Sequence, residues 1–167
     1  MLCVIARLSP DASEKLLSVR EAALPLVQEQ APFYGHITIA TYLPEEDAGF
    51  VEDCGRIVRA CPPFSVRYER IGLLSETSVI AAEPSCAGGL RALHRRIAGE
   101  FGVHLDQWTR DESWRPHTTL IYDPAAELDA VCQVMRRRFS PFETRISRIE
   151  FSRVEEAGYR ILDAIDL

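Results

Sequence analysis

The chain has 167 residues, the size of one ordinary domain, and its composition of 47% hydrophobic and 26% charged residues excludes a disordered or fibrous protein. The net charge of −6 argues against a broad basic surface for a nucleic-acid duplex, although a small anion could occupy a locally positive pocket. Because no apolar run could span a bilayer and no basic leader stands at the start, we expect a cytoplasmic protein without membrane contact.

Hydrophobic periodicity predicts four elements over the first sixty residues. A buried strand at 2–8 ends at Ser9-Pro10, and a strand at 36–42 begins with a histidine. A helix that Asp11 or Ser13 can cap lies between these strands, and its buried stripe consists of Leu16, Val19, Ala23 and Leu26. A second helix at 45–60 carries apolar residues at helical spacing.

The same order returns after a predicted hairpin of strands at 64–74 and 79–83. A helix at 89–101 comes first, then a strand at 117–123 that again begins with a histidine. The next helix carries Leu128, Val131, Met135 and Phe139 on one stripe. A last strand pair, 142–154 and 159–166, turns at 155–158, where a glycine can adopt the left-handed conformation.

A repeated string of letters supports an internal duplication. Residues 63–71 and 141–149 share a proline, a phenylalanine, two arginines and an isoleucine, at an offset of 141 − 63 = 78. The histidines His36 and His117 are offset by 117 − 36 = 81. We therefore predict one domain, 1–167, made of two pseudo-symmetric lobes, whose pseudo-twofold packing brings His36 towards His117.

Each of these histidines stands two residues before a threonine on a predicted strand. Because side chains alternate between the faces of a strand, His36 and Thr38 share one face, while Ile37 and Ile39 share the other. The same alternation places His117 and Thr119 together, with Ile121 on their side. A single such motif is usually structural, but two at equivalent positions of a repeat indicate a shared site.

This grouping has the chemistry needed to cleave a phosphate diester. Histidine titrates near neutrality, so one imidazole can accept a proton from the attacking oxygen while the other protonates the leaving oxygen. The hydroxyls of Thr38 and Thr119 can donate to the non-bridging phosphate oxygens as charge develops. Neither role requires a metal, so we expect neither metal nor cofactor.

The motifs His36-Ile37-Thr38-Ile39 and His117-Thr118-Thr119-Leu120 resemble the signature of the two-histidine phosphoesterase superfamily, particularly its RNA 2′,5′-ligase and cyclic phosphodiesterase branch. The likeness covers nearly the whole chain. It implies a bilobal α+β fold in which two antiparallel sheets line a central cleft and helices pack outside. It also implies that the histidines and threonines of both motifs contact phosphate.

The resemblance further implies a substrate that carries a 2′,3′-cyclic phosphate or a 2′,5′ linkage, on an RNA end or a small nucleotide. Aromatic residues near the motifs could stack a base and an arginine could steer the anion; we select Tyr34, Trp114 and Arg115 as rim residues. One position departs from the family pattern: Gly35 stands where members often carry proline, whereas Pro116 keeps it.

Two other classes of function remain open. A nucleotide- or RNA-binding module with the same cleft and little turnover would not need two titrating groups. A metal hydrolase would need further ligands near the histidines, and neither motif contains a suitably spaced cluster. No protein partner is evident, and His94 and His104 are assigned structural or surface roles.

Overall fold

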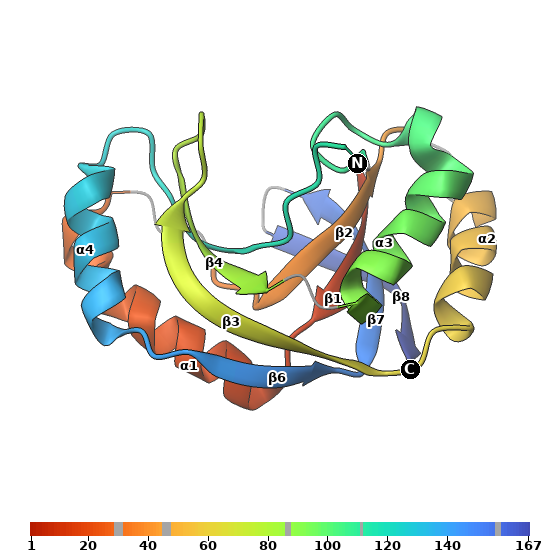
Figure 1. The fold of residues 1–167 in the computed structure, drawn as a ribbon. Coiled ribbons are helices and arrows are strands. Elements are labelled where there is room, and N and C mark those ends of the chain that lie inside the picture. Colours follow the sequence, from red (N-terminus) through yellow and green to blue (C-terminus); the bar gives the residue numbers. More distant parts are fainter. Residues whose placement is uncertain (29–31, 45–47, 86–87, 111, 156–157) are drawn as a thin grey trace.

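Two antiparallel four-stranded sheets form the centre of this computed structural model, which describes residues 1–28, 32–44, 48–85, 88–110, 112–155 and 158–167 (Figure 1). The first sheet has the order β2-β1-β7-β8, and the second has the order β5-β4-β3-β6. The strands of the first sheet are β1 (Leu2–Arg7), β2 (His36–Tyr42), β7 (Arg148–Glu155) and β8 (Gly158–Asp166). Those of the second are β3 (Phe64–Leu73), β4 (Val79–Ser85), β5 (Thr118–Tyr122) and β6 (Phe142–Ile146).

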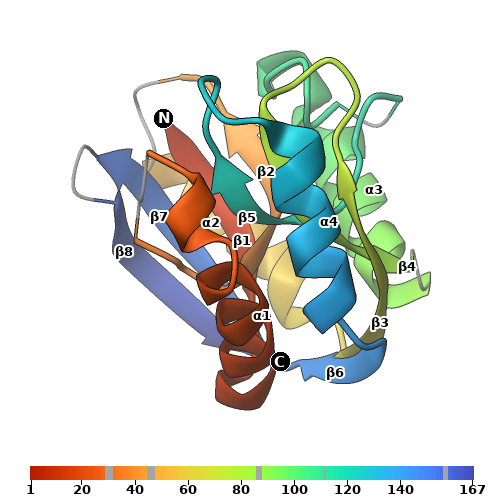
Figure 2. The ribbon, with the colours of Figure 1, turned by 90° about the vertical axis from the view of Figure 1, so that its left-hand side faces the viewer.

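Helices cover the outside of both sheets. Figure 2 shows α1 (Pro10–Glu21) and α4 (Leu128–Arg138) side by side over the second sheet, while α2 (Ala48–Arg59) and α3 (Gly88–Phe101) cover the first. Short 3-10 turns lie at Leu24–Leu26 and Gly102–His104. The predicted α+β fold class, with two antiparallel sheets and outer helices, is confirmed. None of the described helices is long and apolar enough to cross a membrane.

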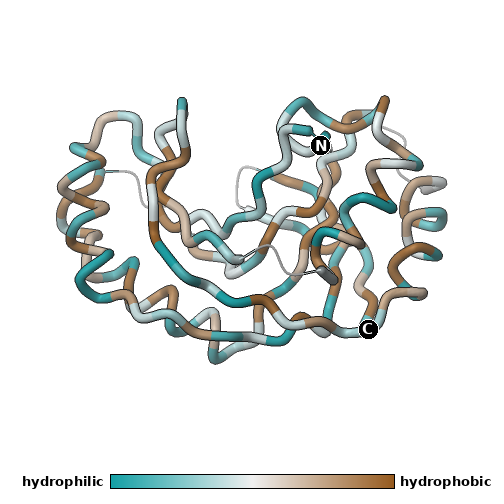
Figure 3. The backbone as a smooth tube through the Cα atoms, in the orientation of Figure 1, coloured by the Kyte–Doolittle hydropathy of each residue, from teal (hydrophilic) through white to brown (hydrophobic). Residues whose placement is uncertain are grey.

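Two helices are exchanged between the sheets. Helix α1 lies between β1 and β2 in sequence, yet it packs against β5 of the second sheet. Helix α3 lies between β4 and β5, yet it packs against β2 of the first sheet. Apolar and polar residues alternate along these elements, as expected where one face is buried (Figure 3). The buried residues of both sheets consequently belong to one hydrophobic cluster.

The two copies of the repeated string pair with each other. Strands β3 and β6 are antiparallel, with Phe64 opposite Ile146 and Tyr68 opposite Phe142. Phe64 and Phe142 are repeat equivalents at the offset 142 − 64 = 78, so Val66 and its equivalent Thr144 stand opposite each other. This register is the one that a twofold axis through the Val66–Thr144 pair would produce.

Three expected element boundaries are wrong. Ser9, rather than Asp11 or Ser13, caps α1, because its hydroxyl accepts from the Ala12 amide at 3.2 Å and Pro10 suits the first helical position. The helix ends at Glu21, so the last member of the predicted stripe, Leu26, is 48% exposed.

The third wrong boundary concerns residues 142–154, which were expected to form one strand. The strand breaks at Ser147, whose carbonyl accepts from the Leu167 amide at 2.8 Å, and its two halves enter different sheets. At the predicted final turn Gly158 has φ +122°, the left-handed conformation that the pattern indicated. Residues 156–157 of that turn and 45–47 of the second predicted helix lie outside the described residues.

Candidate active site

The two histidine motifs lie at the inner edges of the two sheets, where β2 and β5 meet. His36 begins β2, and His117 directly precedes β5 instead of lying within it as predicted. The Thr118 hydroxyl donates to the His36 carbonyl at 2.8 Å. Since that hydroxyl proton is used, the buried Tyr68 hydroxyl donates to Thr118 at 2.6 Å. A side chain of the second motif thus fixes the backbone of the first.

Both motif strands contain an irregularity directly after the motif threonine. In β2, Ile5 pairs with Thr38 and Val4 with Ala40, so Ile39 has no partner in β1. In β5, Ala81 pairs with Thr119 and Ile80 with Ile121, so Leu120 has no partner in β4. These are β-bulges, which often re-aim side chains beside active sites.

The bulge corrects the predicted faces of the second motif. Strict alternation placed Ile121 beside Thr119, but the extra residue turns Ile121 inward, where it is buried. Thr119 is exposed and Thr118 is buried. Thr38 of the first motif is half-buried, between the buried Ile37 and Ile39.

Buried side chains cap the carbonyl of each bulged residue, and each comes from an exchanged helix. His94 on α3 donates through Nδ1 to the Ile39 carbonyl at 2.9 Å. Arg20 on α1 donates through Nε to the Leu120 carbonyl, also at 2.9 Å. Ile39 and Leu120 are equivalent at the offset 120 − 39 = 81, so the two caps occupy matching positions. His94 is therefore structural, as expected, and Arg20 is a supporting residue that the sequence did not single out.

The two motif imidazoles have the same hydrogen-bond arrangement. His36 Nδ1 lies 2.5 Å from the Tyr34 carbonyl, and His117 Nδ1 lies 2.7 Å from the Arg115 carbonyl. A carbonyl only accepts hydrogen bonds, so Nδ1 carries a proton in each ring. The atom that gains or loses a proton is then Nε2 in both histidines.

Burial keeps His36 neutral. It lowers the pKa of His36 to about 4, and the nearby positive charges of His117 and Arg7 act in the same direction. The Tyr34 carbonyl and the Glu150 carboxylate oppose this lowering without cancelling it. Because the charge of His117 acts on His36, the fold brings the two histidines within electrostatic range.

His117 experiences a different charge. Burial again lowers its pKa, while the Arg115 carbonyl and the carboxylate of Glu83 act to raise it. Arg7 of β1 stands opposite His36 in register. Glu83 follows Ala82 on β4, and Ala82 stands opposite Thr118, so Glu83 occupies the corresponding place beside His117. A positive residue, Arg7, therefore acts on His36 in addition to the carboxylate of Glu150, whereas the carboxylate of Glu83 acts on His117.

Tyr34, a predicted rim residue, is held in a network beside His36. Its hydroxyl donates to Glu150 at 2.6 Å, and the Arg7 guanidinium lies 3.8 Å from its ring centroid. Tyr159 on β8 stacks on Tyr34 at 5.6 Å and meets the His36 ring edge-on at 4.7 Å. Sequence reasoning missed Arg7, Glu150 and Tyr159. Glu150 could have been found, because a glutamate between two apolar residues of a predicted strand is unusual and indicates a buried polar contact.

Trp114, a predicted rim residue, is almost fully buried, with an exposed fraction of 5%, and it lines the pocket beside the second motif. Its ring stacks on His94 at 3.9 Å, and its indole Nε1 donates to the Thr38 carbonyl at 3.0 Å. Trp114 therefore supports the first motif from within the fold. Arg115 is exposed, in agreement with a rim position.

The departure at Gly35 has a packing reason. A Cβ atom there would overlap the side chain of Ser13 on α1. The Gly35 carbonyl also accepts from Arg7 at 2.7 Å and from the Leu8 amide at 3.0 Å. The close approach of α1 consequently requires glycine at this position, directly before His36.

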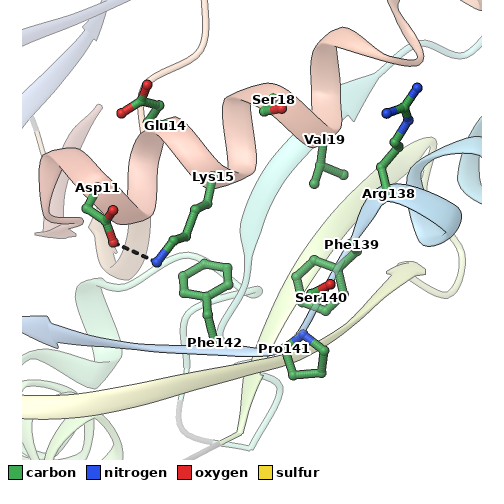
Figure 4. Close-up of a pocket in the computed structure, with 10 residues that line it drawn as sticks. All are labelled: Asp11, Glu14, Lys15, Ser18, Val19, Arg138, Phe139, Ser140, Pro141 and Phe142. Carbon is green, nitrogen blue, oxygen red and sulfur yellow. Dashed lines mark hydrogen bonds and ion pairs between the residues drawn. The ribbon is translucent and has the colours of Figure 1, made fainter.

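Among the surface pockets, one adjoins the second motif. It has a volume of about 370 Å³ and is lined by Arg70, Glu83, Arg91, Trp114, Arg115 and Pro116 together with the β3–β4 turn. A pocket of about 550 Å³ lies between α1 and the segment leading into β6, and no residue of either motif lines it (Figure 4). Within the described part of the chain, no group of three or more histidine, cysteine, aspartate or glutamate residues could hold a metal ion.

Comparison with known proteins yields one family and several similar structures. The model of the 2′-5′ RNA ligase superfamily matches residues 34–158. No curated protein matches the chain significantly.

Three solved structures show the same fold at low sequence identity. TT0787 of Thermus thermophilus is 21% identical, with a TM-score of 0.66 over 99% of this chain and 97% of that one. E. coli LigT complexed with 3′-AMP is 15% identical, with a TM-score of 0.70 over 99% and 96%. Kluyveromyces marxianus Usb1 is 11% identical, with a TM-score of 0.55 over 99% and 97%.

Proposed function

The chain belongs to the 2′-5′ RNA ligase superfamily, and from this premise we propose that it is a metal-independent phosphoesterase acting on a 2′,3′-cyclic phosphate or 2′,5′-phosphodiester. The substrate is an RNA end or a small nucleotide. His36 and His117 are the catalytic residues in this proposal, and Thr38 and Thr119 bind the phosphate. A phosphoesterase-type function follows from the family, and the substrate and residue roles are our proposal.

The observation that carries the proposal is the matched arrangement of the two imidazoles. Each ring is oriented by a carbonyl two residues earlier, and each keeps Nε2 for proton transfer. General acid–base catalysis needs one such group to accept a proton and another to donate one. A pure binding module, the alternative function, has no use for two rings held in the same titrating geometry.

The different neighbours of the two histidines indicate which one is the general base and which one is the general acid. His36, whose pKa burial lowers to about 4, is neutral over most of the pH range and suits the general base. His117 has the carboxylate of Glu83 nearby, which favours its protonated form and suits the general acid.

In hydrolysis, His36 Nε2 takes a proton from water as the water oxygen attacks phosphorus. His117 Nε2 gives its proton to the ribose oxygen as that oxygen leaves, so the cyclic diester becomes a monoester. A ribose 5′-hydroxyl in place of water would give ligation through the same proton transfers. E. coli LigT was crystallised with 3′-AMP, which is one of the two monoesters that opening adenosine 2′,3′-cyclic phosphate can produce.

The first test is turnover of nucleoside 2′,3′-cyclic phosphates with a chelator present. We expect His36→Ala and His117→Ala each to lose at least about 100-fold in kcat, the usual contribution of a general acid or base. His104→Ala is the matched control, since His104 is an exposed histidine outside both motifs.

Each alternative result has a defined meaning. Turnover that persists in both alanine variants would reject the site assignment. Tight nucleotide binding by the unmodified protein without turnover would favour the binding module, and turnover abolished by the chelator would favour a metal hydrolase.

A further inference from the structure

The pocket beside the second motif is positively charged in a protein of negative net charge. We call it the arginine pocket and define it by Arg70, Arg91, Arg115, Glu83 and Trp114, with Pro116 at its edge. Three arginines and one glutamate give it a formal charge of 3 − 1 = +2, against −6 for the whole chain.

Two other pockets lined by described residues do not share this charge. The pocket between α1 and β6 has two carboxylates, Asp11 and Glu14, and two cations, Lys15 and Arg138, so its formal charge is zero. The pocket beside α2 has Asp53 and Glu100 and no arginine or lysine. Of these three pockets, the arginine pocket next to His117 is therefore the one with a net positive charge. This charge would attract a negatively charged ligand.

Two of the three arginines have no carboxylate partner in the described part of the chain. Arg70 pairs with Glu83 at 2.6 Å. Arg91, on the first turn of α3, has its guanidinium carbon 5.9 Å from the Trp114 ring centroid, and neither it nor Arg115 forms an ion pair with a described residue. Two guanidinium groups thus remain available to an anion, and guanidinium matches phosphate in both charge and hydrogen-bond geometry.

The pocket is contiguous with the proposed reaction site but does not contain it. Arg115 and Pro116 line the pocket and directly precede His117. Glu83 also links the two, because it lines the pocket and acts electrostatically on His117. Neither histidine nor either motif threonine lines the pocket, so an anion bound there would be separate from the reacting phosphate.

We propose that the arginine pocket binds a second phosphate group of the substrate, held by Arg91 and Arg115. This inference rests on the proposed function for the identity of the reacting phosphate. The second phosphate comes either from the 5′ end of the same nucleoside or from the diester that joins it to the preceding nucleotide. The substrate class is thereby narrowed to nucleotides that carry at least two phosphates.

Equilibrium binding of product-like ligands tests the proposal without requiring turnover. The ligands are adenosine 3′-phosphate, adenosine 3′,5′-bisphosphate and a diadenosine dinucleotide ending in a 3′-phosphate, titrated calorimetrically at constant ionic strength. We expect a ligand with the second phosphate to bind about tenfold tighter than adenosine 3′-phosphate, the effect of one charge-assisted hydrogen-bond set. The bisphosphate and the dinucleotide distinguish the two sources of that phosphate.

The variants are Arg91→Ala and Arg115→Ala, with Arg137→Ala as the matched control. Arg137 is an exposed arginine on α4, over the outside of the second sheet. Both variants should remove most of the preference, and Arg91→Ala should leave the affinity for adenosine 3′-phosphate within about twofold. Arg137→Ala should leave both affinities unchanged.

The outcomes separate this proposal from the proposed function. A wild-type protein without preference for the two-phosphate ligands, or without binding of any of them, overturns the arginine pocket. A preference that survives in Arg91→Ala and Arg115→Ala overturns it as well. The turnover of the histidine variants is a separate measurement. The catalytic assignment can therefore hold if the arginine pocket is overturned, and the arginine pocket can hold if the catalytic assignment is rejected.

Discussion

At the scale of single residues, Arg7 and Glu83 make two matched histidines unequal. The Nδ1 hydrogen bonds are the same in both motifs, so these cannot distinguish a base from an acid. Burial lowers the pKa of both, but His36 also has the positive charges of His117 and Arg7 beside it, opposed by Glu150, whereas the charged group acting on His117 is the Glu83 carboxylate. In our proposal, the different charges around the two histidines let two matched motifs supply two different proton-transfer groups.

The pH dependence of kcat/KM follows from this asymmetry. The rate should rise with pH through about 4 as His36 loses its proton. As the pH rises further, the rate should fall when His117 loses its proton. The midpoint of this fall should lie below pH 6.5, because the pKa of His117 is lowered from that value. An optimum in this acidic window, measured with a nucleoside 2′,3′-cyclic phosphate, is the expected result.

Glu83→Gln tests the cause of the falling limb. Removing the carboxylate lowers the pKa of His117 further, so the falling limb moves to lower pH while the rising limb stays in place. Glu69→Gln is the control, since Glu69 is an exposed glutamate of β3 that pairs with Arg67 instead. A falling limb that does not move in Glu83→Gln would refute the assignment of His117 as the acid.

At the scale of elements, the β-bulges depend on side chains from the exchanged helices. Ile39 and Leu120 have no register partner at the bulges, and His94 and Arg20 donate to their carbonyls. An unsatisfied buried carbonyl costs about 1–3 kcal/mol, so the donors stabilise the bulge that directly follows each motif threonine.

His94→Phe should therefore affect both stability and catalysis. The ring can still stack on Trp114, but the donor to the Ile39 carbonyl is lost. We expect the free energy of unfolding to fall by about 1–3 kcal/mol and kcat to fall several-fold at unchanged KM. Arg20→Met should give the same pattern from the opposite lobe.

Urea unfolding and steady-state kinetics measure these effects, with His104→Phe as the matched histidine control. Destabilisation with unchanged kcat would show that the caps contribute to folding alone. Unchanged stability in both variants would show that the bulges hold their shape without them.

At the scale of the whole molecule, the helix exchange makes the two lobes interdependent. Each sheet is covered partly by a helix that lies in sequence within the other sheet's half. We expect urea unfolding to be a single cooperative transition, with the same midpoint by far-ultraviolet circular dichroism and by tryptophan fluorescence. Separate midpoints for the two signals would indicate lobes that fold independently and would contradict the prediction of one domain.

Much of this architecture was predictable because local patterns determine it. Periodicity located the helices and strands to within a few residues, and β2 was predicted from His36 to Tyr42, as found. The errors concern Ser147 and Leu26, where a change of sheet and an early helix end leave no mark in hydrophobic spacing. The burial of Trp114 and its stacking on His94 were not predicted, because periodicity cannot report what packs on a loop residue.

The sequence by itself determined the repeat, the two histidine–threonine motifs and the family, since these depend only on the order of residue types. The tertiary structure decided which charges accompany each histidine, how the bulges turn Ile121 inward, and where the arginine pocket forms. Arg70, Arg91 and Arg115 are far apart in sequence, and the pairing of β4 with β3 and with β5, together with the packing of α3, brings them together. Contacts between distant segments depend on the whole fold, and no local pattern encodes them.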